Sequence, residues 1–185
     1  MKNTWKTLLY AVLVVIFSMD AIAKDHGAGK HYVFNLVGTG TAYPSMVPSL
    51  DGQGEMEANC FDVDLIDLKN QRLIGTATDC LSVQEIIGEA EFIRLIGTTT
   101  FNLPQGTLTT QGLTTVAKVM QVTNTPAIGE VTHFTAAAGT DNAILGGTSR
   151  FRNATGTARL SGMVNLSELG NGVITFDCIF VIDLD

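Results

Sequence analysis

Two aspartates are the residues of this chain whose type and spacing are best suited to chemistry. Asp62 and Asp64 lie two residues apart in an alternating segment, so a β-strand would place both carboxyl groups on one face. Inside a cavity the two carboxylates would repel each other, and one of them could hold a proton and act as an acid or bind a polar ligand. Arg94 alternates with apolar residues further along the chain and is a candidate counter-ion. On a solvent face the same aspartates would only add solubility, and the pattern leaves both interpretations open.

Several common catalytic and cofactor-binding motifs are missing from the sequence. It contains no G-x-S-x-G, no H-E-x-x-H and no G-x-x-x-x-G-K. Its three histidines do not have the spacing of metal ligands. The 18 acidic and 11 basic residues give a formal net charge of −7, which disfavours binding to nucleic acid. We therefore predict no metal site, no cofactor and no nucleic-acid partner.

Three cysteines limit the disulfide pairing. The segment from Cys60 to Cys80 reads as a β-hairpin around residues 69–71, and a three-residue loop there places Cys60 opposite Cys80. A two-residue loop would shift the pairing and separate them. We predict a Cys60–Cys80 disulfide, with Cys178 as a buried, unreactive thiol on the apolar face of its strand.

The elements that must position these residues are strands. Alternating apolar and polar residues, separated by turn residues, predict nine strands and no sustained helical stripe. They are expected near 32–38, 57–68, 72–83, 91–102, 106–111, 132–138, 143–146, 156–165 and 173–184. Many long strands with short turns favour a closed barrel or a sandwich.

The first 23 residues have the features of a signal peptide. Lys2 and Lys6 precede the apolar run Leu8–Phe17, and Ala21-Ile22-Ala23 is an A-x-A cleavage site. The run is too short to span a bilayer, which disfavours the alternative of an uncleaved anchor. We therefore expect a single domain at residues 24–185, secreted or periplasmic, with no membrane association after cleavage. Export would permit disulfides.

One stretch near the C-terminus resembles a signature of a known protein superfamily. Plant dirigent proteins and allene oxide cyclases share a G-G-[TS]-G-x-F-x-x-A-x-G pattern, and Ser149 here replaces its third glycine. Two earlier segments, Leu73–Cys80 and Gly106–Gly112, resemble strands of the same superfamily in the same order. The residues that match the signature are Gly146, Gly147, Thr148, Phe151, Ala154 and Gly156.

This resemblance implies an all-β fold, a closed antiparallel barrel of about eight strands. It also implies a homotrimer or homodimer and a central cavity for a small hydrophobic or phenolic ligand. Gly146 and Gly147 would permit a tight bend, Phe151 would close one side of it, and Gly156 completes the structural motif. Residues 116–130 have no counterpart and are expected to form an inserted hairpin or loop.

The resemblance also suggests a site. Cys80 matches the cavity cysteine of the cyclases, whereas Asn35 replaces their essential acid, so we predict no allene oxide cyclase activity. Because Thr78 and Asp62 share a face with Cys80 in the predicted register, that face is expected to line the lumen. The candidate catalytic residues are Asp62 and Asp64, and the candidate ligand-binding residues are Asn35, Thr78, Cys80 and Arg94.

The expected function is binding of the ligand and guidance of its coupling or cyclisation, without a cofactor. One alternative is an isomerase or cyclase that uses an acid in the lumen. The other is a structural or interaction protein whose barrel is filled by its own side chains.

Overall fold

The structure, a computed structural model, describes residues 30–68, 70–89 and 91–185. The predicted signal peptide lies outside these residues. Within them the fold is all-β, with ten antiparallel strands and three short 3-10 turns, η1–η3. The strands are β1 (Lys30–Thr41), β2 (Tyr43–Pro48), β3 (Glu55–Asp67), β4 (Arg72–Ile87), β5 (Phe92–Leu103), β6 (Gly106–Thr125), β7 (Gly129–Ala137), β8 (Asn142–Gly147), β9 (Gly156–Asn165) and β10 (Val173–Leu184).

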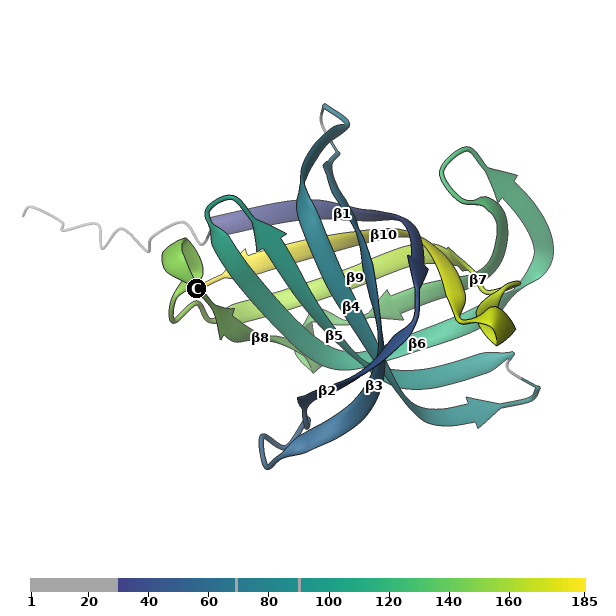
Figure 1. Cartoon of the computed structure of the whole chain (residues 1–185), viewed down its shortest axis with the longest axis horizontal. Coiled ribbons are helices and arrows are strands. Elements are labelled where there is room, and N and C mark those ends of the chain that lie inside the picture. The colour runs from purple at the N-terminus through teal and green to yellow at the C-terminus, as the bar shows by residue number, and fades with distance from the viewer. Residues whose placement is uncertain (1–29, 69, 90) are drawn as a thin grey trace, which may run out of the picture.

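Backbone pairing through eight of these strands forms a ring. The order is β1-β10-β9-β7-β6-β5-β4-β3, and β3 returns to β1 through three residue pairs, from Asn35–Ile66 to Val37–Asp64 (Figure 1). β7 and β8 occupy the same place in the ring, between β6 and β9. Each of them pairs with β6 and with β9, over a different stretch. β2 lies beside β3, outside the ring.

The alternating sequence of β10 shows why the ring has an apolar interior. Residues 174, 176, 178, 180 and 182 are all buried, and the residues between them are only partly buried. A strand turns successive side chains to opposite faces, so this pattern sends one row to the interior. The other strands contribute similar rows, such as Phe61, Val63 and Leu65 of β3.

One end of the interior is filled by aromatic rings. Phe101 packs on Phe34 and Phe180 with ring centroids 5.3 and 5.1 Å apart, and Phe151 packs edge-on against Tyr32 at 5.7 Å. Phe151 belongs to η2 (Ser149–Phe151), which covers the left-hand end of the molecule in Figure 1. At the opposite end, the β4–β5 and β6–β7 hairpins and η3 (Leu169–Asn171) extend beyond the ring.

Most of the strands predicted from the sequence are present, with two differences. β2 was not predicted, because its two prolines in six residues do not resemble a strand. β6 continues to Thr125, so that residues 116–130, expected to be an inserted hairpin or loop, extend the β6–β7 hairpin.

The predicted disulfide is confirmed. Cys60 and Cys80 are directly opposite in the β3–β4 register and are bonded to each other. The loop has one residue more than predicted, since Asp67 pairs with Arg72, and a register shift at Leu65/Ile66 restores the expected pairing. Val47 of β2 packs over the bridge on the outer side of the ring.

No helix in the described part of the chain is long and apolar enough to cross a membrane.

Candidate functional site

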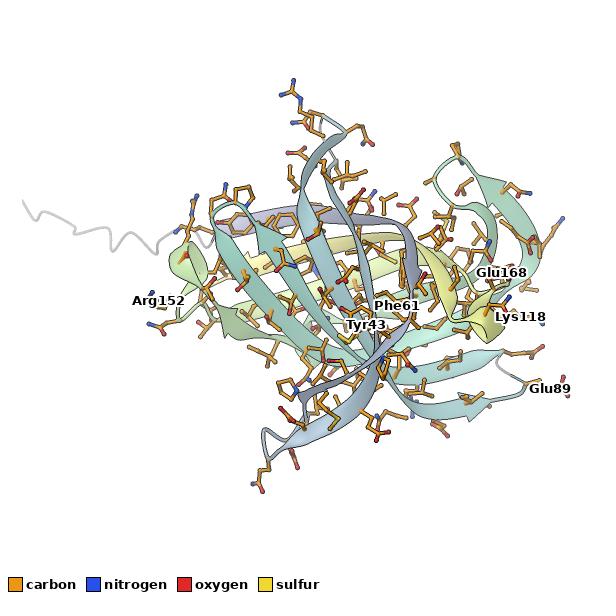
Figure 2. The ribbon with its side chains drawn as sticks, in the orientation of Figure 1. Tyr43, Phe61, Glu89, Lys118, Arg152 and Glu168 are labelled. Carbon is orange, nitrogen blue, oxygen red and sulfur yellow. A yellow bond between two sulfur atoms is a disulfide. The ribbon has the colours of Figure 1, made fainter. Side chains whose placement is uncertain are left out.

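The interior of the ring contains a cavity of about 110 Å³. It lies beyond the aromatic end, and Val83 and Leu169, which are both exposed, mark where it reaches solvent. Glu89, Lys118 and Glu168 lie at this open end, whereas Arg152 lies at the opposite end (Figure 2). Most of the wall is apolar, formed by Leu36, Phe61, Leu81, Val83, Ile93, Leu95, Val116, Leu160, Val164, Leu166, Leu169, Ile174, Phe176 and Phe180.

Asp79 of β4 is the acidic group in this wall. It is only 7% exposed, and one carboxyl oxygen accepts a 2.6 Å hydrogen bond from the Thr99 hydroxyl. Burial raises the pKa of Asp79 to about 6, because the charged form loses its hydration, and the hydrogen bond from Thr99 offsets part of that rise. Near neutral pH this carboxyl group can therefore exist in either protonation state.

Cys178 lines the same cavity as a free, buried thiol. Burial raises its pKa, and the charges of Asp79 and Asp177 raise it further. The thiolate is the nucleophilic form of cysteine, so this side chain remains a neutral thiol at physiological pH. Cys178 is therefore part of the wall and has little nucleophilic character, in agreement with its predicted unreactive role.

Asn142 is a further polar residue of the wall. It stands where η1 (Gly139–Asp141) ends and β8 begins, and its side chain is 4% exposed. Its amide oxygen is buried without a hydrogen-bond partner. Thr99, Thr114 and Thr135 supply buried hydroxyl groups to the same wall.

The candidate catalytic residues lie on the other face of the sheet. Asp62 and Asp64 are exposed, because their neighbours Phe61, Val63 and Leu65 take the interior positions of β3. The prediction that the two aspartates line the lumen is therefore wrong. The phenol of Tyr43 and the hydroxyl of Thr78 both donate to Asp62, at 3.2 and 2.6 Å.

None of the four candidate ligand-binding residues lines the cavity either. Thr78 and Cys80 share the outer face with Asp62, and Cys80 is held in the disulfide. Arg94 forms a 3.4 Å ion pair with Glu85, both side chains being about half exposed.

Asn35 lies on the outer face of β1, since Phe34 and Leu36 on either side of it point into the core. Its position beside the β1–β3 closure, opposite Ile66, makes it a residue of the seam of the ring.

The predicted structural glycines occupy constrained positions. A Cβ at Gly147 would lie 2.2 Å from the carbonyl oxygen of Thr107, and one at Gly156 would lie 2.0 Å from that of Asp183. Gly146 and Gly156 also have φ angles of +131° and +138°, which side chains disfavour. This segment holds Phe151 in place, and it is not part of the cavity wall.

Sequence reasoning missed Asp79 because it assigned the wrong face of the hairpin to the interior. In β4 Asp79 alternates with Ala77, Leu81 and Val83, and an isolated acid in an apolar row was the available signal. The sequence analysis instead placed the more polar row, which contains Asp62 and Asp64, in the interior.

No family model matches this chain, and a search of curated proteins finds no match either.

Proposed function

We propose that this protein is a β-barrel that binds a small, largely apolar molecule in its interior. The observation that carries the proposal is the cavity itself, which the ring encloses and which opens at one end. A cavity of roughly 150 Å³ with apolar walls binds benzene, so about 110 Å³ limits a ligand to no more than about one ring. The same observation disfavours a barrel completely filled by its own side chains.

Short motifs that resemble those of dirigent proteins and allene oxide cyclases support this proposal. In those proteins such motifs accompany a closed barrel with an interior ligand. Assignment to that superfamily is part of the proposal, as is assembly into a homotrimer or homodimer. Native mass spectrometry of protein from its own source would report the oligomer and any retained ligand together.

A second candidate function is an isomerase or cyclase in which Asp79 is the acid. The observation that favours it is a carboxyl group in an apolar cavity with a pKa of about 6. A group with this pKa can give a proton to a bound molecule and take one back near neutral pH without a cofactor. This role for Asp79 replaces the role predicted for Asp62 and Asp64.

Binding of toluene tests the primary proposal. We expect saturable binding in a calorimetric or NMR titration, weakened at least tenfold by Val116→Phe, because Val116 lines the cavity and is 7% exposed. Val122→Phe is the matched control, since Val122 lies on the same strand but is 56% exposed. Absence of binding to the wild-type protein, or equal loss in both variants, would contradict the proposal.

We also propose that the protein is exported, to the periplasm or outside the cell. The Cys60–Cys80 disulfide supports this location, because such bonds persist in oxidising compartments. N-terminal sequencing of the protein from its own source should begin at Lys24, and a mature chain that retains Met1 would contradict cleavage.

A further inference from the structure

Asn142 is the least explained polar residue of the interior. The residue is only 4% exposed in the cavity wall, and its Oδ1 atom has no hydrogen-bond partner. Buried polar groups in folded proteins are almost always hydrogen-bonded, so an unpartnered amide oxygen at a cavity wall favours a partner from outside the chain.

The local backbone does not require asparagine here. Asparagine is favoured where φ is positive or where its side chain caps a turn. Asn142 has an extended backbone with φ −134° and ψ 103°, and its Oδ1 atom accepts no hydrogen bond from the η1 turn. An apolar residue of similar size would satisfy the backbone and the apolar wall equally well.

Two glycines make room beside this amide. In the strand register, Leu81, Gly97, Gly112 and Asn142 follow one another across β4, β5, β6 and β8. A Cβ at Gly112 would lie 2.4 Å from the Cα of Asn142, so glycine is required for β8 to approach β6 this closely. Gly97 lines the cavity, and a Cβ there would lie only 3.1 Å from the Thr114 hydroxyl oxygen, so glycine leaves room for that hydroxyl group.

We propose that Asn142 determines ligand specificity by hydrogen-bonding a hydroxyl group on an otherwise apolar, ring-sized molecule. An amide can present its oxygen as acceptor or its NH₂ as donor after a 180° rotation, and a hydroxyl group can partner either one. The size of the cavity limits the apolar part to about one ring.

The ligand carries no negative charge. Asp79 is the one ionisable acid among the described residues that line the cavity, and none of these lining residues is a lysine, arginine or histidine. A carboxylate ligand would therefore meet like charge and no cation. This inference rests on the proposed binding function and adds the chemical class of the ligand.

Phenol and toluene form a matched pair of probes, because they differ only in a hydroxyl and a methyl group. Each is titrated into the purified wild-type protein, Asn142→Leu and Asn102→Leu at a pH where phenol is neutral. Asn102 of β5 is exposed and is not among the residues that line the cavity, so it controls for the same substitution away from the site. We expect wild-type protein and Asn102→Leu to bind phenol at least tenfold more tightly than toluene, and Asn142→Leu to lose this preference.

The outcomes separate the two proposals. If toluene binds the wild-type protein as tightly as phenol, the cavity is a ligand site and the role of Asn142 is wrong, and this comparison holds even if Asn142→Leu does not fold. A preference for phenol that survives Asn142→Leu would also overturn the inference. If neither probe binds, the proposed binding function fails, and the specificity inference fails with it.

Discussion

The carboxyl group of Asp79 couples the charge of the cavity to pH. Its folded-state pKa of about 6 lies above the ordinary value of 3.8, because burial penalises the charged form. The folded protein therefore holds this proton more tightly than the unfolded chain. The resulting stabilisation is fully present below about pH 4 and is lost as the pH rises through 6.

We predict that Asp79→Asn removes this pH dependence. A rise of about two pKa units corresponds to about 3 kcal/mol, so the variant should gain about that much stability relative to wild type between pH 4 and pH 7. Urea unfolding across this range measures the difference. Asp62→Asn makes the same change at an exposed aspartate and is the control. If the difference in unfolding free energy between wild type and Asp79→Asn does not vary with pH, the burial of Asp79 is contradicted.

Residue types alone predicted that carboxyl groups could form the site, but not which aspartates face the interior of the sheet. Asp62 and Asp79 lie on adjacent strands, and only strand parity sends one outward and the other inward. Both faces of this hairpin alternate, so the pattern satisfies either choice. The deciding fact, that Phe61 packs against Phe176 of β10, depends on a contact between distant parts of the chain.

At the scale of elements, the β8–η2–β9 segment depends on a close backbone approach at Gly147. We predict that Gly147→Ala lowers the free energy of unfolding by at least about 2 kcal/mol, because its Cβ would meet the Thr107 carbonyl and Phe151. Gly170→Ala is the control: nothing lies within 4 Å of its Cβ position, and its effect should stay within about 0.5 kcal/mol. Equal losses of unfolding free energy in the two variants, measured by chemical denaturation, would contradict a close backbone approach at Gly147.

The β3–β4 hairpin depends on its disulfide. The bridge closes a loop of 20 residues, and loop-closure entropy predicts that reduction costs about 3 kcal/mol. Denaturation with and without reductant measures this loss. The double variant Cys60→Ser/Cys80→Ser should be insensitive to reductant, and a wild-type protein equally insensitive would show that the bridge does not form.

Local patterns predicted the elements better than their connections. The hairpin register that joins Cys60 to Cys80 was predictable because it involves neighbouring segments. The β1–β3 closure was not, since only three residue pairs form it and no local signal marks them. The residues of β2 contain prolines and pair along one side only, as edge strands do.

At the scale of the whole molecule, the ring has one filled end and one hollow end. Aromatic side chains around Phe101 and Phe151 close the first, and the cavity with Asp79 and Asn142 occupies the second. This division is compatible with a stable fold and a binding site in one domain, because the packed end supplies the core that the hollow end lacks.

The most direct test of this account is to locate bound toluene by intermolecular nuclear Overhauser effects in methyl-labelled protein. The cavity predicts contacts from the toluene protons to the methyl groups of Leu95, Val116 and Ile174, which line its wall. Contacts confined to exposed apolar residues such as Leu73 and Leu145, or no contacts at saturating toluene, would contradict the claim that the interior of the ring is a ligand site.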